Sequence, residues 1–362
     1  MDRRSALASM LALALDPRSA GARSASRELT RRFPGLAGLP WLDLARFPTP
    51  LEESPALARA LGVGRLLIKR DDRAGATYGG SKLRKLELLL GDAEARGHRA
   101  VAAVGGVGSN QTLATAVFAK QRGLRAHLYL LAERPSAGVR EHLLAQAALG
   151  AQQQLVGAES QAVRAIARLP DRPYSIPMGG SSPLGNVGFV EAGLELARQV
   201  QADVVYMPLG TGGSAVGLAL GLQVAGAATH VVAVRAASMR YASPSLIRRS
   251  TRDISSVLLA RDAQFPAHDR LPHLGVRDGF VGKGYTEPTE AGRRMRTLAR
   301  DVAGLELDLT YSAKAMAALR ADAGKLRDKT VVFWLSYDPR RVDAAGVGPD
   351  DLPRALRGYV HG

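Results

Sequence analysis

The chain has 362 residues, a length that predicts about two domains. Hydrophobic residues make up 46% of it, which is enough to build buried cores and excludes a disordered protein. The absence of cysteine excludes disulfides, thiolate catalysis, cysteine-based zinc sites and iron–sulfur clusters.

The formal net charge is +16, and most of the basic residues are arginines scattered along the chain. Aromatic residues make up only 5%, and no basic run interleaves with them. We therefore expect a positive field that attracts small anions such as carboxylates and phosphates, and no specific nucleic-acid partner. No apolar run approaches the roughly 20 residues of a membrane span, so we expect no membrane partner.

The first 45 residues are predicted to form a loosely docked N-terminal extension. Two arginines precede an apolar stretch over residues 6–15, and small residues at 20–22 resemble a signal-peptide cleavage site. The alternative is a short amphipathic helix that ends at Asp16 and Pro17. We favour the helix, because charged residues and a proline at 16–18 interrupt the approach to the cleavage site, and we expect a cytoplasmic protein.

Beyond the extension, apolar runs alternate with helical patterns. Strands are predicted at 66–68, 100–104, 126–131, 154–156, 174–177, 204–208, 230–234, 305–309 and 330–335. Helices are predicted at 111–123, 139–149, 160–168, 188–200, 214–225, 289–302 and 312–324, with outer helices within 243–270. Such alternation indicates βαβ units, and hence an α/β fold whose mostly parallel sheets are covered by helices on both faces.

A lysine stands at the end of a glycine turn, in the run Gly79-Gly80-Ser81-Lys82, just before a predicted helix. The glycine pair allows a backbone or a flat ligand to approach closely. An amine held at the end of an element can lose its proton and attack an aldehyde. The alternative is an ordinary surface lysine at a helix start.

A glycine-rich loop joins the strand at 204–208 to the next helix. Its residues are Gly210, Thr211, Gly212, Gly213 and Ser214. Backbone amides of such a loop, together with the positive end of the helix, can hold a phosphate, and we favour this over a plain tight turn.

The same loop also fits a dinucleotide fingerprint through Gly210, Gly212 and Ala215. The strand at 230–234 lacks the acidic residue that this fingerprint needs. Arg235 could instead bind a 2′-phosphate, so an NADP-dependent oxidoreductase stays as an alternative.

Polar residues also mark three other loops. Ser109, Asn110, Gln111 and Thr112 open the helix after the strand at 100–104, where they could be helix caps or could grip a carboxylate. Tyr285 follows a glycine loop and is either an acid–base phenol or an aromatic packed on the core. Ser312, which follows Tyr311, is at the least a candidate helix cap.

Taken in sequence order, these blocks resemble the pyridoxal-phosphate enzymes of the D-cysteine desulfhydrase and 1-aminocyclopropane-1-carboxylate (ACC) deaminase family, within the tryptophan-synthase-β-like fold. The resemblance runs from about Phe47 to about Phe333. Its strongest blocks are Lys69 to Glu87, Ser109-Asn110, Gly179 to Gly188, and Gly284 to Met316.

The resemblance implies a role for each candidate residue. Lys82 would form the imine with pyridoxal 5′-phosphate, Asn110 would lie beside the phenolic oxygen of the cofactor, and the loop at 210–214 would hold its phosphate. Ser109, Gln111 and Thr112 would hold the substrate carboxylate. Tyr285 and Tyr311 match two active-site tyrosines. Ser312 falls where a side chain faces the pyridine nitrogen, and a hydroxyl there favours β-elimination.

The chain departs from the family at two places. Gln111 stands where the family usually has histidine, and glutamine cannot titrate near neutral pH. The segment Leu335-Ser336-Tyr337-Asp338-Pro339 stands where the family usually has a His-Thr/Leu-Gly-Gly type segment. These departures leave open a catalytically altered homologue that binds the cofactor or another ligand without turnover.

The resemblance further implies the architecture and the activity. We expect a large cofactor-binding domain formed by residues 46–85 and 179–362, and a small domain formed by residues 86–178. The expected activity is that of a lyase or deaminase that converts a small amino acid, such as D-cysteine or ACC, into a keto acid and ammonia. The resemblance also implies a homodimer.

Overall fold

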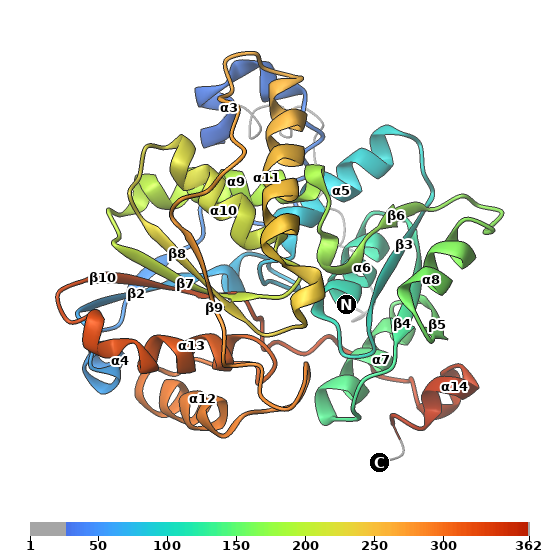
Figure 1. Cartoon of the computed structure of the whole chain (residues 1–362). Helices are drawn as coiled ribbons and strands as arrows, with labels where there is room; N and C mark the ends of the chain where they lie inside the picture. Colours follow the sequence, from blue (N-terminus) through green and yellow to red (C-terminus); the bar gives the residue numbers. More distant parts are fainter. Residues whose placement is uncertain (1–26, 361–362) are drawn as a thin grey trace, which may run out of the picture.

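The computed structural model describes residues 27–360, which form two sheets flanked by helices (Figure 1). The larger sheet has six strands in the order β1-β2-β10-β7-β8-β9, all parallel except β1, which pairs antiparallel with β2. Its strands are β1 (Leu51–Glu53), β2 (Arg65–Arg70), β7 (Val204–Leu209), β8 (His230–Arg235), β9 (Leu274–Arg277) and β10 (Thr330–Leu335). The short strands β1 and β9 were not predicted.

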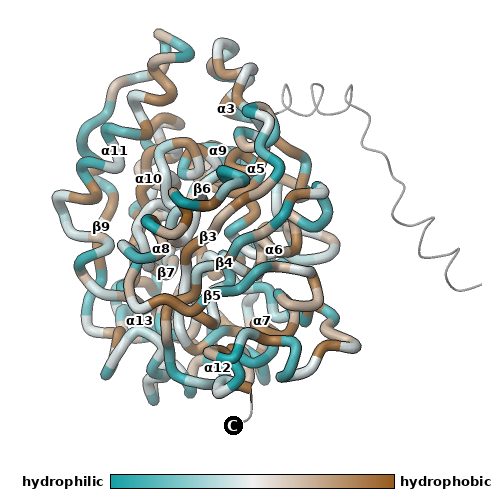
Figure 2. The backbone as a smooth tube through the Cα atoms, turned by 90° about the vertical axis from the view of Figure 1, so that its right-hand side faces the viewer, coloured by the Kyte–Doolittle hydropathy of each residue, from teal (hydrophilic) through white to brown (hydrophobic). Residues whose placement is uncertain are grey.

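The smaller sheet has four parallel strands in the order β5-β4-β3-β6. Its strands are β3 (Ala100–Gly106), β4 (Arg125–Leu131), β5 (Gln152–Val156) and β6 (Tyr174–Ile176). Strand β3 is buried along its whole length, which is typical of a parallel strand covered on both faces. In Figure 2, hydrophobic segments of the chain run through the strands in the middle of the molecule.

Helices cover both faces of each sheet, so the predicted α/β fold class is confirmed. The larger sheet has α4 (Pro55–Leu61), α12 (Glu290–Ala303) and α13 (Ser312–Ala321) on one face, and α9 (Pro183–Gln199), α10 (Gly213–Val224) and α11 (Pro244–Leu259) on the other (Figure 1). Around the smaller sheet lie α5 (Leu83–Ala95), α6 (Asn110–Gln121), α7 (Ala137–Ala148) and α8 (Glu159–Ile166).

Helix α9 begins five residues before the predicted start at Gly188. Ser182 accepts a hydrogen bond from the Gly185 amide, and Pro183 occupies the first helical turn, where a proline loses no hydrogen bond. Glycine at 188 serves packing, because a Cβ there would lie 1.8 Å from the carbonyl oxygen of Arg84. The capping signal therefore decides the start of this helix.

The prediction of a strand at 305–309 is wrong. Leu305 and Leu307 are buried and alternate with more exposed residues, as in a strand, but they pack as a loop against the larger sheet and join no ladder. The loop ends where Asp308 accepts hydrogen bonds from the amides of Tyr311 and Ser312 and so caps α13.

The expectation of loose docking is wrong for residues 27–45. Leu29 and Leu36 are fully buried, and both pack in one cluster with residues of α9 and α11. Helix α3 (Glu28–Arg32) is held through its backbone, because Glu191 accepts hydrogen bonds from the amides of residues 28 and 29 at 2.9 and 2.8 Å. The signal-peptide question falls on residues 1–26, which lie outside the described residues.

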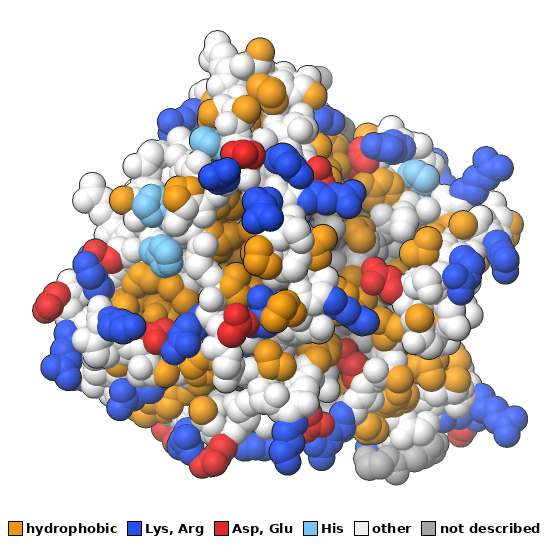
Figure 3. Space-filling model, in the orientation of Figure 1, with side chains coloured by type: hydrophobic (Ala, Val, Ile, Leu, Met, Phe, Trp, Pro, Cys, Tyr) orange, Lys and Arg blue, Asp and Glu red, His pale blue; other side chains and the backbone are white. Residues whose placement is uncertain are grey.

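The C-terminal segment packs with the smaller sheet, although it follows β10 of the larger one. Leu352, Leu356 and Val360 belong to the same buried cluster as α5, α6 and α7, and α14 (Arg354–Arg357) contacts β5. Both sheets fall within the residue ranges predicted for them, and the domain bounds themselves stay a prediction. No helix within residues 27–360 is long and apolar enough to cross a membrane. On the face shown in Figure 3, Lys and Arg side chains are scattered.

Four buried charged residues tie β2 and the turn after it to α5 and α9. Arg84 donates to Asp71 at 2.8 Å and to Glu195 at 2.9 Å, and Lys69 pairs with Glu195. Each of the four side chains is at most 4% exposed. Burial alone would raise the pKa of Asp71, but Arg84 and Lys69 outweigh it and hold that pKa below its usual value. The carboxylate therefore stays charged, and its contribution to stability is lost only as the pH falls through this lowered pKa.

Replacing Arg84 with methionine should lower the free energy of unfolding by about 3–5 kcal/mol, because it leaves two buried carboxylates facing one lysine. Urea unfolding followed by circular dichroism measures the change. The matched control is Arg65→Met, which removes an exposed pair with Glu53 and should cost less than about 1 kcal/mol. Equal losses in the two variants would contradict the prediction.

Candidate active site

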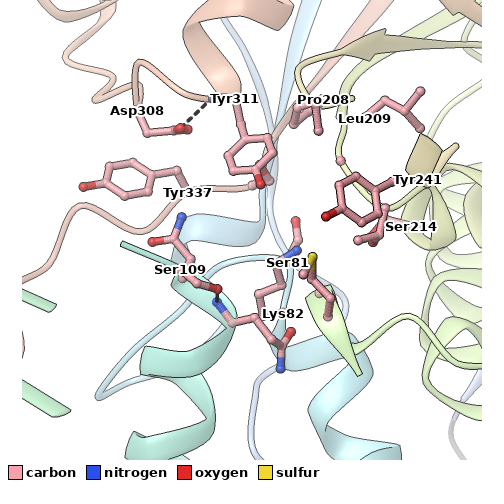
Figure 4. A pocket seen from close by; sticks show the side chains of 18 of the residues that line it. Ser81, Lys82, Ser109, Pro208, Leu209, Ser214, Tyr241, Asp308, Tyr311 and Tyr337 are labelled. Carbon is pink, nitrogen blue, oxygen red and sulfur yellow. Dashed lines mark hydrogen bonds between the residues drawn. The ribbon is translucent and has the colours of Figure 1, made fainter. Parts of the chain in front are cut away.

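The turns after strands of both sheets converge on one cavity of about 420 Å³ (Figure 4). The larger sheet contributes the turn that ends in Lys82, the loop 210–214 after β7 and residues 336–338 after β10. The smaller sheet contributes residues 109–111 after β3 and Glu133 after β4. Ligands of α/β proteins bind in this position, at the carboxyl ends of the strands.

Lys82 lies on the cavity at the N-terminus of α5. Ser81 holds the turn before Lys82 in place. The Ser81 hydroxyl donates to Asp71 at 2.9 Å, and the Ser81 amide donates to the carbonyl of Ser336 at 3.1 Å. Burial lowers the pKa of Lys82 from 10.5 to about 8, although Asp308 opposes the shift. A substantial fraction of this amine is therefore neutral, and so nucleophilic, at mildly alkaline pH.

A second buried lysine lies one helical turn along α5. Lys85 donates to the carbonyl of Gly179 at 3.2 Å and to the hydroxyl of Ser181 at 2.8 Å. The Ser181 hydroxyl lies 2.6 Å from that of Thr211, in the loop after β7. Burial lowers the pKa of Lys85 well below its usual value. Through Ser181, Lys85 thus links α5 to the glycine-rich loop 210–214.

The loop 210–214 has the geometry of an anion cradle. Gly210, Thr211, Gly212 and Ser214 line the cavity, whereas Gly213 is buried as the first residue of α10. Gly212 has φ +88°, which favours glycine. No side chain of the described residues caps α10, so its first amides remain available to an anion.

The predicted carboxylate site is only partly present. Ser109, Asn110 and Gln111 line the cavity, but Thr112 is fully buried and accepts a hydrogen bond from Gln146 at 3.1 Å. The Ser109 hydroxyl caps α6, because it accepts from the amides of residues 111 and 112 at 3.2 and 3.4 Å. The side-chain oxygen of Gln111 has no hydrogen-bond partner among the described residues, and it remains available to a ligand.

Two tyrosines meet at the cavity. The hydroxyls of Tyr285 and Tyr311 are hydrogen-bonded to each other, and their rings are 5.7 Å apart in an edge-to-face arrangement. Burial raises the pKa values of both phenols, so both stay protonated near neutral pH. In Figure 4, Tyr311 lies on the opposite side of the cavity from Lys82. The site thus has an amine on one side and a pair of proton-donating phenols on the other.

Ser312 does not lie where the resemblance places it. It is fully buried, it does not line the cavity, and its hydroxyl donates to the Asp308 carboxylate at 2.5 Å. The side chain is turned inward because it forms part of the capping arrangement of α13. The hydroxyl that the cavity receives from the end of β10 is that of Ser336.

The cavity-lining residues that sequence reasoning missed include Glu133, Tyr78 and Tyr241. Glu133 accepts a hydrogen bond from the amide of Gly108 at 3.2 Å, and burial raises its pKa. Its charge contributes to the raised pKa values of both Tyr285 and Tyr311, and all three residues line the cavity. The signal was its position two residues after a predicted parallel strand, where site residues collect.

Comparisons with known proteins identify the family. A family model described as "Pyridoxal-phosphate dependent enzyme" matches residues 42–336. The chain belongs to this family.

Two curated relatives and one solved structure show the range of the similarity. Nocardicin C-9′ epimerase of Nocardia uniformis subsp. tsuyamanensis is 33% identical over 341 residues, which cover 90% of this chain and 100% of that protein. D-cysteine desulfhydrase of Klebsiella pneumoniae is 32% identical, with 78% and 88% covered. A crystal structure of an ACC deaminase homologue has a TM-score of 0.75 at 28% identity, with 85% and 94% covered.

The site fits pyridoxal phosphate, the cofactor of this family. An amine of lowered pKa and an uncapped helix N-terminus face one cavity, and they suit the aldehyde and the phosphate of that molecule. The nicotinamide alternative loses its main support, because Arg235 is paired with Asp278 and donates to the carbonyl of Ala242.

The lowered pKa of Lys82 predicts its reactivity in the cofactor-free protein. Pulse acetylation from pH 6 to pH 11, followed by peptide mass spectrometry, should show half-maximal labelling of Lys82 near pH 8, because the neutral amine is the reactive form. The control is the same lysine in the urea-unfolded chain, where the midpoint should return to about 10.4. Identical midpoints in the folded and unfolded chains would contradict the prediction.

Proposed function

We propose that this protein is a pyridoxal-phosphate-dependent lyase or deaminase of a small amino acid. The favoured reaction is β-elimination from D-cysteine, and the second is the ring-opening deamination of ACC. With cysteine and one water, the products are pyruvate, hydrogen sulfide and ammonia. The observation that carries the proposal is the placement of Lys82, the loop 210–214 and the tyrosine pair around one cavity. The relatives named D-cysteine desulfhydrase and ACC deaminase homologue support it.

Each group of the chain has a definite task in this proposal. The loop 210–214 and the N-terminus of α10 would hold the phosphate of the cofactor, and Asn110 would lie beside its ring. When bound, the cofactor withdraws electrons from the Cα of the amino acid. Ser109 and Gln111 hold the substrate carboxylate at the start of α6, and Lys82 removes the α-proton once its amine is free. Tyr285 and Tyr311 supply a proton to the departing group from the other side.

A second candidate is epimerisation at Cα, in which a proton removed on one side of that carbon is returned on the other. Two observations favour it. The epimerase relative is matched over its full length, and Lys82 and Tyr311 lie on opposite sides of the cavity. The preference for elimination no longer has support from Ser312, because that hydroxyl is bonded to Asp308.

Lys82→Ala should abolish covalent cofactor attachment. Borohydride reduction of the holoenzyme should fix the cofactor to the peptide containing Lys82, and mass spectrometry detects the label. The control is Lys120→Ala, which removes an exposed lysine and should leave the label in place. A label at another lysine, or none in the wild-type protein, would overturn the proposal.

Product analysis across a panel of D- and L-amino acids separates the reactions. Keto acid and ammonia identify elimination or deamination. Inversion at Cα, with incorporation of deuterium from D₂O and no ammonia, identifies epimerisation. Bound cofactor with neither outcome identifies the catalytically altered homologue, for which Gln111 and Tyr337 are the notable departures.

Tyr311→Phe removes one hydroxyl of the tyrosine pair while keeping its ring. Loss of a general acid should lower kcat by about 10²- to 10⁴-fold, and the visible absorbance of the bound cofactor should persist. For an epimerase, exchange of the α-proton should survive while inversion is lost. Unchanged kcat would remove the tyrosine pair from the mechanism. Tyr359→Phe, which lies in the C-terminal segment, is the control.

We further propose a cytoplasmic location, and also a homodimer, which the resemblance implies. Light scattering of the purified holoenzyme tests the dimer, and a monomer at assay concentration would contradict it.

A further inference from the structure

The segment after β10, residues 336–340, is called here the strap, and it lies against the turn that leads to Lys82. The carbonyl of Ser336 accepts the hydrogen bond from the Ser81 amide at 3.1 Å. The Asp338 carboxylate accepts from the amide of Gly79 at 2.5 Å. The strap thus satisfies two amides of the last four residues before the helix of Lys82.

Arg340 closes the strap over the same turn. Its guanidinium donates to both carboxylate oxygens of Asp338 at 2.9 Å. It also donates to the carbonyls of Ala76 at 2.5 Å, Gly75 at 2.7 Å and Asp72 at 3.3 Å. One side chain therefore satisfies three carbonyls of the loop and orients the carboxylate that accepts from the Gly79 amide. Arginine suits this arrangement because its planar fork carries five donors.

The packing leaves the turn little freedom. A Cβ at Gly79 would lie 2.9 Å from Arg340 and 2.3 Å from the carbonyl of Asp72. Gly80 has φ +88°, and a Cβ there would lie 2.9 Å from the carbonyl of Ser336. The two glycines before Lys82 are thus matched to the strap, as well as to the cavity.

We propose that Asp338 and Arg340 are positioning residues, which hold residues 72–81 against β10 and thereby set the place of the Lys82 amine in the cavity. This inference rests on the proposed function in one respect, namely that Lys82 carries the cofactor. Asp338 is 4% exposed and lines the cavity, yet Arg340 neutralises it, so it adds no unpaired charge beside the reacting groups. The departure from the family at Asp338 then has a structural purpose.

The neighbouring Arg341 provides a matched control. It is 80% exposed and pairs only at the surface, with Glu141 at 3.0 Å. Arg340→Ala and Arg341→Ala remove the same side chain from adjacent positions, but only the first touches the turn before Lys82. Any difference between the two variants therefore reports on the contacts of Arg340.

Amide hydrogen exchange of the cofactor-free protein tests the positioning directly. In Arg340→Ala, the peptide covering residues 76–82 should exchange at least about tenfold faster than in the wild type, the change expected from losing one hydrogen bond to a charged group. The same peptide should be unchanged in Arg341→Ala. Equal protection in the two variants would overturn the proposal.

The holoenzyme supplies a second readout. A displaced amine should lower kcat of Arg340→Ala by about ten- to a hundredfold, with a smaller change in KM. The pH midpoint of the visible absorbance band should also shift, and Arg340→Lys should recover part of both effects. Changes in KM alone, or identical profiles for both alanine variants, would overturn the proposal.

The two proposals fail in distinguishable ways. If borohydride labels no lysine in the wild type while Arg340→Ala still loosens residues 76–82, the proposed function fails and the strap stands. If Lys82 is labelled but Arg340→Ala changes neither the amide exchange nor the pH profile, only the proposal about the strap fails. Should Arg340→Ala not fold, Arg340→Lys and Arg341→Lys are compared in the same two measurements, and that pair decides.

Discussion

The buried carboxylate of Asp71 is the constraint on which the site depends. It lies at the end of β2 with no exposure to solvent, so every lone pair needs a partner within the protein. Thr49 supplies one partner at 3.0 Å, and Arg84, Ser81 and the indole of Trp334 supply the others at 2.8 to 2.9 Å. The last three come from α5, from the turn before it and from β10. Satisfying one carboxylate therefore draws together the elements that carry Lys82.

The same constraint explains how two sheets share one site. Arg84 also reaches Glu195 of α9, the helix that covers the larger sheet, while α5 packs in the cluster of the smaller sheet. Helix α5 is thus held by the larger sheet on one side and by the smaller sheet on the other. The cavity opens between the two sheets. Because parallel strands end at one edge, the loops of both sheets deliver their polar residues to this opening. The strap at 336–340 adds a second hold on the lysine turn, from the end of β10.

Much of this arrangement could be predicted from local sequence. A glycine turn before Lys82, and glycines between β7 and α10, are signals that need only a few residues of context, and the cavity contains both. Which side chains pair with one another could not be predicted in this way. Ser312 was assigned by its place in a motif, but Asp308, four residues earlier, takes its hydroxyl. Leu305 and Leu307 imitate a strand because a loop packed on a sheet also buries every second residue.

Residues whose role depends on a contact far along the chain were hidden for the same reason. In the sequence, Asp338 is only a departure from the family, because nothing there shows that Arg340 and the amide of Gly79 will surround it. The lyase and epimerase hypotheses share the removal of one α-proton by Lys82 and differ only in the step after that removal. A substrate with a good β-leaving group loses that group, whereas one without it can only regain a proton. Under both hypotheses, the groups that line the cavity around the substrate, such as Glu133 and Tyr241, would therefore decide the reaction by deciding which amino acid enters.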